Sequence, residues 1–186
     1  MKIGVILGST RPGRLGASIA SWVMEHAEKR TDAEFGLVDV DAYRLPLLDE
    51  PLPPILQQVT HQHTKDWAAA IAGYDAFVFI AAEYNRSVPG ALKNALDYLF
   101  HEWHNKAAGI VSYGGVVGGA RAAESLRLVL GELKVATTRE GVFINTRTDF
   151  ENWTVFNPTD QHVAALNTVF DEVVAWGSAL KPLRDA

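Results

Sequence analysis

The stretch GSTRPGRLG, residues 8–16, stands between two segments with clear patterns. Residues 2–7 before it (KIGVIL) are apolar at nearly every position, which is typical of a parallel strand covered on both faces. Residues 17–30 after it carry apolar side chains at roughly helical spacing, so they predict a helix. A loop of small and cationic residues between a strand and a helix indicates an anion site, because the loop amides and the helix N-terminus can point at one phosphate.

The composition of this loop separates it from two common phosphate motifs. The dinucleotide fingerprint needs a glycine at position 10, which is Thr10, and no Gly-Lys-Ser/Thr of a P-loop follows. A single phosphate monoester is therefore the better match. The loop offers it two hydroxyls and two cations, Ser9, Thr10, Arg11 and Arg14. The alternative is a glycine-rich turn between strand and helix with solvated arginines.

Outside this stretch, strand and helix patterns alternate along the chain. Apolar runs predict further strands at residues 34–40, 75–81, 106–112 and within 134–145, the last in one or two pieces. Periodic apolar residues predict helices at residues 60–73, from 87–89 to about 103, at 120–133, and from about 158 to before Pro182. The remaining segments are a Pro- and Leu-rich excursion at 41–58 and a polar, aromatic stretch at 146–157. Right-handed crossovers then give one α/β domain over residues 1–186, with a parallel sheet and helices on both faces.

Three loops of unusual composition follow the first, third and fourth predicted strands. Ligands of open α/β sheets bind at the carboxyl ends of the strands, and these three strands are neighbours in the strand order 2-1-3-4-5. Residues 82–86 bring an aromatic ring and an amide, Tyr84 and Asn85, to this edge. Residues 112–119 contain four glycines, which let backbone pass close to a planar ligand. Taken singly, the two loops are also explained as a helix-capping turn and a flexible turn.

These three motifs resemble a known family. GSTRPGRLG, AAEYNRSVPGALKNALDYL and SYGGVVGGARA look like the NAD(P)H-dependent FMN reductases of the flavodoxin-like fold, which include quinone, azo-dye and chromate reductases. The resemblance covers roughly residues 1–145 and implies a five-stranded parallel sheet in the order 2-1-3-4-5. The family usually reads Pro-Glu-Tyr-Asn in the second motif, where this chain has Ala82 in place of the proline.

The resemblance also implies a cofactor and its ligands. It places the FMN phosphate at the first loop and the ring and ribityl chain between the other two. The implied contacts are Ser9, Arg11, Arg14, Leu15 and Gly16 for the phosphate, and Ala82, Glu83, Tyr84, Asn85, Ser112, Tyr113, Gly114 and Gly115 for the rest of FMN. No catalytic side chain is assigned, although Tyr84 and Tyr113 are candidates to wall the ring.

The implied reaction passes hydride from NADPH or NADH through FMN to a small acceptor in a ping-pong cycle. Quinones, azo compounds and flavins are among the acceptors that such a site can take. Members of the family form dimers or dimer pairs, for which the helix from Gly90 to Trp103 is the expected contact surface. Two alternatives stay open: a flavodoxin-like electron carrier that does not oxidise NAD(P)H, and a nucleotide-binding module without flavin. Arg11, Arg14 and a modest net charge favour the reductase over the carrier.

Composition limits the other classes of function. The net charge is −5, from 17 basic and 22 acidic residues without a basic run, which argues against a nucleic-acid surface. The chain has no cysteine, so it has no disulfide or thiolate metal site. His101 and His104 are three apart rather than four, which argues against a zincin-type metal site.

We expect no signal peptide and no membrane span, hence a cytoplasmic protein. We expect Trp103, Trp153 and Trp176 in the core or at a subunit interface.

Overall fold

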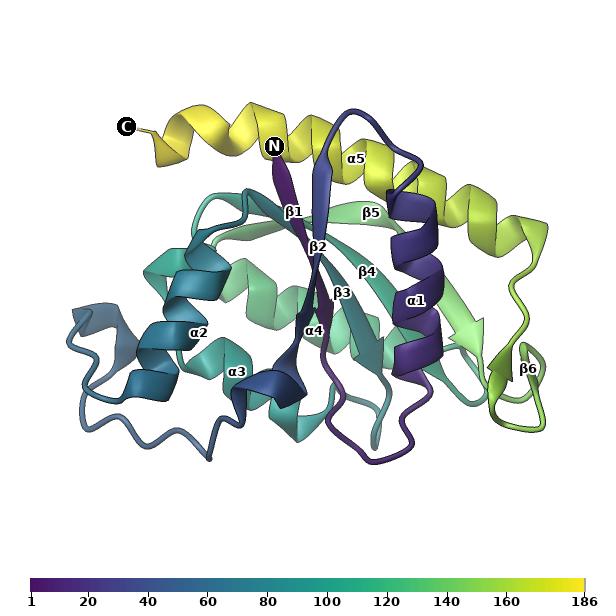
Figure 1. The fold of residues 1–186 in the computed structure, drawn as a ribbon, viewed down its shortest axis with the longest axis horizontal. Helices are drawn as coiled ribbons and strands as arrows, with labels where there is room; N and C mark the ends of the chain where they lie inside the picture. Colours follow the sequence, from purple (N-terminus) through teal and green to yellow (C-terminus); the bar gives the residue numbers. More distant parts are fainter. Residues whose placement is uncertain (186) are drawn as a thin grey trace.

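The structure, a computed structural model, describes residues 1–185 and has one central sheet (Figure 1). Five parallel strands lie in the order β2-β1-β3-β4-β5, which confirms the predicted flavodoxin-like topology. The strands are β1 (Lys2–Leu7), β2 (Glu34–Asp39), β3 (Ala76–Ala82), β4 (Lys106–Gly114) and β5 (Val135–Asn145). Every residue of β3 and β4 is buried, as expected for central strands that are mostly apolar and covered on both faces.

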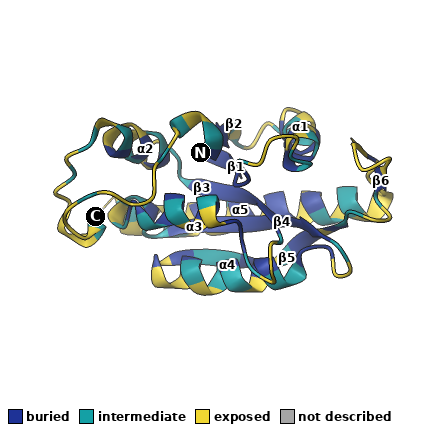
Figure 2. Ribbon diagram, turned by 90° about the horizontal axis from the view of Figure 1, so that it is seen from below, coloured by how far each residue is buried: buried dark blue, intermediate teal, exposed yellow. Residues whose placement is uncertain are grey.

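Helices cover both faces of the sheet and create two apolar cores. One core joins the sheet to α1 (Gly16–Ala27) and α5 (Asp160–Arg184). The other joins it to α2 (Gln62–Ala72), α3 (Gly90–Asp97) and α4 (Ala120–Glu132). Figure 2 shows the inner strands β1, β3 and β4 in the colour of buried residues, while the helices expose their outer sides. No helix within residues 1–185 is long and apolar enough to span a bilayer.

Two helix ends differ from the sequence prediction. The helix expected to reach residue 103 ends at Asp97, and the chain turns at Phe100 before a short 3₁₀ helix, η3 (His101–Trp103). The turn lets the Trp103 indole enter the core, where its Nε1 donates to the Leu96 carbonyl oxygen at 3.3 Å. The last helix runs through Pro182 to Arg184. Pro182 interrupts only its final turn, and Arg184 anchors this end by an ion pair with Asp75 at 2.9 Å.

Two further segments are more regular than their sequence indicates. β5 is a single strand with a register shift against β4 between Ala108 and Ile110. The polar stretch at 146–157 contains an antiparallel hairpin of β6 (Phe150–Glu151) and β7 (Val155–Phe156). Phe150 and Phe156 are both buried in the core shared with α1 and α5. The hairpin therefore packs at the end of the sheet nearest α1, although it lacks a periodicity that would predict it.

The structure buries the apolar side of the expected contact helix and one of the three tryptophans. Leu92, Leu96 and Trp103 are at most 1% exposed, so the apolar side of segment 90–103 faces this chain's own core rather than a partner. Trp103 is a core residue, as one of the two expectations had it. Trp153 and Trp176 are 61% and 44% exposed, so they lie outside the core, and their assignment to a subunit interface stays a prediction.

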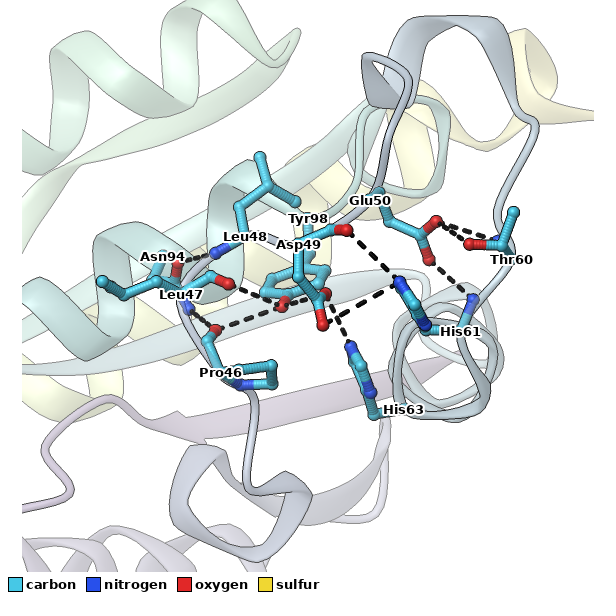
Figure 3. A network of polar contacts seen from close by, with 10 residues as sticks. All are labelled: Pro46, Leu47, Leu48, Asp49, Glu50, Thr60, His61, His63, Asn94 and Tyr98. Atoms are coloured by element: carbon cyan, nitrogen blue, oxygen red, sulfur yellow. Dashed lines mark hydrogen bonds and ion pairs between the residues drawn. The ribbon is translucent and has the colours of Figure 1, made fainter.

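The excursion at 41–58 is a surface segment, as predicted, and a polar network fixes it (Figure 3). It contains two short 3₁₀ helices, η1 (Val40–Tyr43) and η2 (Pro54–Leu56). One Asp49 carboxylate oxygen accepts a hydrogen bond from the Tyr98 hydroxyl at 2.9 Å and lies 2.9 Å from His63 Nε2. Glu50 accepts from the Thr60 hydroxyl at 2.7 Å and from the His61 amide at 3.0 Å. The network ties the excursion to the start of α2 and to the residue after α3.

The network changes the acidity of its members. Desolvation, followed by the hydrogen bond to Asp49, raises the pKa of Tyr98 to about 12. Desolvation alone would raise the pKa of Glu50, but the hydrogen bonds that its carboxylate accepts outweigh it and lower that pKa to about 2. A carboxyl whose pKa is lower in the folded chain than in the unfolded chain stabilises the fold above its unfolded pKa, and this contribution is lost as the pH falls.

The lowered pKa of Glu50 predicts how the stability of a Glu50→Gln variant changes with pH. At pH 6 the variant should unfold at lower urea concentration than the wild type, because the amide loses the charge-assisted bonds to Thr60 and His61. The difference should shrink between pH 4.5 and pH 2, the window between the ordinary and the lowered pKa. A difference that stays constant over this range would contradict the account.

Gly109 is the position where α5 comes closest to the sheet. A Cβ atom there would lie 2.3 Å from Val169 Cγ1 and 3.0 Å from Val173 Cγ2, both on α5. Since β-branched side chains have little rotational freedom in a helix, neither valine can easily yield. The close packing of α5 on β4 therefore depends on the missing side chain of Gly109.

We expect Gly109→Ala to lower the free energy of unfolding by about 1–3 kcal/mol, the usual cost of overpacking a core. Gly131→Ala is the matched control, because Gly131 is helical and a Cβ atom there meets nothing within 4 Å. That variant should raise the free energy of unfolding by about 0.4–1 kcal/mol. Urea denaturation of both variants measures the difference, and equal stability of the two would refute the packing of α5 over Gly109.

Candidate functional site

Three loops meet at the carboxyl edge of β1, β3 and β4. We name them loop 1 (residues 8–15), loop 2 (residues 83–89) and loop 3 (residues 115–119). The Glu83 amide donates to the Tyr113 carbonyl oxygen at 2.8 Å, which extends the β3–β4 pairing into loop 2. The Ser9 and Tyr84 hydroxyls are 3.4 Å apart and join loop 1 to loop 2. The structure thus brings together the three loops that the sequence singled out.

The two arginines of loop 1 have different surroundings. Arg14 turns inward, where its guanidinium donates to the Ser9 carbonyl oxygen and to Asp39 at the end of β2, both at 2.5 Å. Arg11 is exposed and donates only to carbonyl oxygens of its own loop, those of Pro12 and Gly13, at 3.3 Å each. Arg14 therefore shapes the loop, while Arg11 has no carboxylate partner within residues 1–185 and keeps an uncompensated positive charge at the surface of loop 1.

Loop 1 ends at a helix start that no side chain caps. Leu15 occupies the N-cap position of α1 without a capping hydrogen bond, and the first turn has no acidic residue. The amides of such a turn and the positive end of the helix dipole are left for an anion. Ser9 is fully buried beside this start, whereas the side chain of Leu15 packs against the core. Leu15 can thus contribute its backbone to a ligand but not its side chain.

A large cavity opens beside loop 1. Its volume is about 520 Å³, within the usual range for small-molecule sites. Loop 1, the first turn of α1 and the chain after β2 line it: Thr10, Arg11, Pro12, Gly13, Arg14, Ala17, Asp41 and Arg44. Three arginines against one aspartate make the cavity suited to an anionic group.

Tyr113 reaches from β4 towards loop 1. It is 6% exposed, and its hydroxyl has no hydrogen-bond partner within residues 1–185. A Cβ atom on Gly16 would lie 2.7 Å from this hydroxyl, so only glycine fits at the start of α1. Burial raises the pKa of Tyr113 to about 12. Tyr113 therefore keeps its proton at neutral pH and can donate a hydrogen bond beside Ser9.

Loop 2 is a tight turn that presents three side chains to solvent. Tyr84 and Ser87 exchange both backbone hydrogen bonds, at 2.9 and 3.0 Å, and the residues between them have positive φ, 50° at Asn85 and 71° at Arg86. This turn exposes Asn85 and Arg86 and leaves Tyr84 39% exposed. Ala82 before the turn is buried in the last position of β3. It can meet a ligand only through its backbone.

Glu83 does not face the open side of the site. Its side chain is 7% exposed, and one carboxylate oxygen pairs with Arg121 of α4 at 2.5 Å. The other oxygen is buried without a partner in the described residues, as is Nε of Arg121. This ion pair binds loop 2 to the first turn of α4. Glu83 is therefore a residue that fixes the geometry of the site.

Loop 3 is shaped by glycine and by one buried serine. The Ser112 hydroxyl donates to the Gly118 carbonyl oxygen at 3.1 Å and closes the loop. Gly118 and Gly119 have φ of 60° and 82°, and a Cβ atom on Gly119 would lie 2.6 Å from the Tyr113 nitrogen. Gly115 has open space around it, its nearest neighbour being Arg147. A flat ligand can approach the backbone there.

The segment after β5 also belongs to this edge, and the sequence reasoning missed it. The Thr146 amide and hydroxyl donate to the Gly114 carbonyl oxygen at 2.8 and 3.1 Å. The parallel register pairs Gly114 with Asn145, so β4 and β5 end together. The position of this loop at the end of the last strand was the only signal that could have predicted its role. No group of three histidine, aspartate or glutamate residues among the described positions could hold a metal ion.

The Ser112 and Tyr113 hydroxyls differ in their contacts: the first donates within the protein, and the second has no partner among the described residues. We expect Ser112→Ala to lower the free energy of unfolding by about 1–3 kcal/mol, since it leaves the buried Gly118 carbonyl oxygen without a donor. Tyr113→Phe should leave the stability of the ligand-free chain unchanged or slightly raised, because the hydroxyl it removes has no partner. Thermal unfolding of both variants measures the contrast. A larger loss in Tyr113→Phe than in Ser112→Ala would contradict this assignment.

Comparisons with known proteins agree on one family. Residues 1–149 match the family model described as NADPH-dependent FMN reductase. The chain is 46% identical over 136 residues to an NAD(P)H-dependent FMN reductase of Schizosaccharomyces pombe, an alignment that covers 72% of this chain and 68% of that protein. A quinone reductase of Escherichia coli is 27% identical over 191 residues, covering 94% and 95% of the two chains. A solved flavoenzyme, the NAD(P)H:(acceptor) oxidoreductase of Paracoccus denitrificans, shares the fold with a TM-score of 0.74 at 23% identity, over 96% of this chain and 97% of that one.

Proposed function

Because the chain belongs to the NADPH-dependent FMN reductase family, a family of oxidoreductases, we propose that it binds FMN at loops 1 to 3 and transfers hydride from NAD(P)H to a small acceptor. The acceptor is a quinone, a flavin, an azo compound or a similar flat molecule. The observation that carries the proposal is the buried Tyr113 hydroxyl without a partner, beside Ser9 and the uncapped start of α1. A phosphate ester supplies the acceptor oxygens and the negative charge that these groups lack.

The residues of this chain have distinct tasks in that site. The amides at the start of α1, the Ser9 hydroxyl and Arg11 would hold the phosphate, while Arg14 keeps the loop in shape through Asp39. Tyr84 and Asn85 of loop 2 and the backbone at Gly114 and Gly115 would flank the ring. When bound, FMN supplies reversible hydride chemistry, so NAD(P)H and the acceptor can use the same site in turn, in a ping-pong order.

No side-chain acid or base is needed for this reaction. Tyr113 keeps its proton at neutral pH, so its part is to donate a hydrogen bond rather than to accept a proton. Tyr84 is 39% exposed at the edge of the site and would cover one side of it. The chain therefore acts mainly by holding the ligands in place and by leaving one side open to the acceptor.

Cofactor binding and turnover test the proposal in one series. We expect the purified protein to quench FMN fluorescence and to oxidise NADPH or NADH when benzoquinone is added. Plots of reciprocal rate against reciprocal substrate concentration should be parallel at different quinone concentrations. Arg11→Ala should weaken FMN binding about tenfold, the effect of losing a charge-assisted hydrogen bond, and should leave riboflavin binding unchanged.

Arg139→Ala is the matched control for Arg11, because Arg139 lies within β5, away from the three loops. It should bind FMN like the wild type. A protein that does not take up FMN would refute the proposal. One that binds FMN but oxidises neither nucleotide would be the electron carrier instead.

We also propose that the protein is cytoplasmic and that it forms a homodimer or a pair of dimers. The absence of cysteine suits the reducing cytoplasm. A homodimer or a pair of dimers is supported by the apolar side chains exposed on the excursion, such as Leu47 at 85% and Ile55 at 53%. A monomeric mass by light scattering at micromolar concentration would contradict the dimer.

A further inference from the structure

The arginines among the described residues differ in whether they form ion pairs, and Arg139 within β5 forms none although it lies away from the site. Five arginines elsewhere or inside the site pair with carboxylates: Arg14, Arg30, Arg121, Arg127 and Arg184. Four in loops after β1, β2, β3 and β5 form no ion pair within residues 1–185: Arg11, Arg44, Arg86 and Arg147. A chain with a net charge of −5 thus keeps uncompensated positive charge around its candidate site. Such a rim attracts anionic substrates.

Arg86 lines a second cavity beside the site. This cavity has a volume of about 410 Å³ and lies between loop 2 and the start of α4. Its walls are Arg86, Val117, Ala120, Arg121 and Glu124. Val117, which is 41% exposed, and Ala120 give its lining apolar atoms beside the guanidinium groups. It is separate from the cavity at loop 1, which the FMN phosphate would occupy.

The charges of this second cavity do not cancel. Arg121 pairs with Glu83 at 2.5 Å, and Glu124 pairs with Arg127 at 3.3 Å. These two pairs are each neutral, so Arg86 supplies the net charge of the cavity. An anion that enters it meets one guanidinium group free to bind with both of its arms.

The backbone holds Arg86 in place before any ligand arrives. It has φ of 71° in a turn closed by two hydrogen bonds between Tyr84 and Ser87. The Ser87 hydroxyl is 2.7 Å from the Ser125 hydroxyl, which ties the turn to α4. Arg86 is therefore two residues from Tyr84, on a turn that hydrogen bonds close and tie to α4.

We propose that Arg86 determines nucleotide specificity by binding the 2′-phosphate of NADPH in the cavity between loop 2 and α4. This inference rests on the proposed function. NADPH differs from NADH only by that phosphate, which carries the charge and the oxygens that a free guanidinium recognises. Val117 and Ala120 offer an apolar wall to the sugar and base that carry the phosphate. The chain accordingly prefers NADPH.

An Arg86→Asn variant tests the assignment, because asparagine tolerates the positive φ of this turn. On the FMN-loaded enzyme, its kcat/KM for NADPH should fall about tenfold or more, while that for NADH stays within about twofold. Arg86→Lys should recover part of the loss, since it keeps the charge but not the fork. Arg139→Asn should leave the ratio of the two values unchanged.

Calorimetry gives a second readout that does not depend on turnover. Adenosine 2′,5′-bisphosphate should bind the wild type more tightly than 5′-AMP, and Arg86→Asn should abolish this difference. Equal kcat/KM values for both nucleotides in the wild type, or equal losses for both in the variant, would overturn the inference. In either case the enzyme still oxidises NAD(P)H, so the proposed function stands. An FMN-loaded wild type that oxidises neither nucleotide would refute the proposed function itself.

Discussion

The parallel pairing of β3 with β1 on one side and β4 on the other is the constraint on which the site depends. Parallel strands that share a register end at the same edge, so three loops far apart in sequence come within contact distance. The pairing continues past the strands, where the Glu83 amide meets the Tyr113 carbonyl oxygen. A slip of one residue would turn Tyr113 away from Ser9 and α1, because alternate side chains face opposite sides of a sheet.

The charged side chains around the three loops have two roles: some form ion pairs that fix the loops, and others stay unpaired. The Arg14–Asp39 and Arg121–Glu83 pairs fix loop 1 to β2 and loop 2 to α4, each at 2.5 Å. The arginines that remain, Arg11 and Arg86 among them, project from loops that these pairs hold in shape. The site thus combines fixed loop positions with unpaired positive charge at its rim, which suits ligands that bear phosphate groups.

The sequence was sufficient for the sheet and for the identity of the three loops. Continuous apolar runs separated by helical periodicity predict parallel strands, and the fold rules then place residues 8–16, 82–86 and 112–119 at one edge. The orientation and partners of individual side chains could not be predicted in the same way. Arg11 and Arg14 are the same residue type three positions apart, and it is the contacts of Arg14 with Asp39 at the end of β2 and with the Ser9 carbonyl oxygen that turn it inward. Two-residue strands such as β6 are too short to show a period.

The central claim is that loops 1 to 3 together form the FMN site. Titration of ¹⁵N-labelled protein with FMN, followed through its amide resonances, tests it most directly. We expect saturable changes that are largest for residues 9–16, 83–87 and 112–119. We expect little change around Tyr74 and Phe35, which line a cavity at the opposite edge of the sheet. Changes confined to that opposite cavity, or no saturable change at the three loops, would contradict the account.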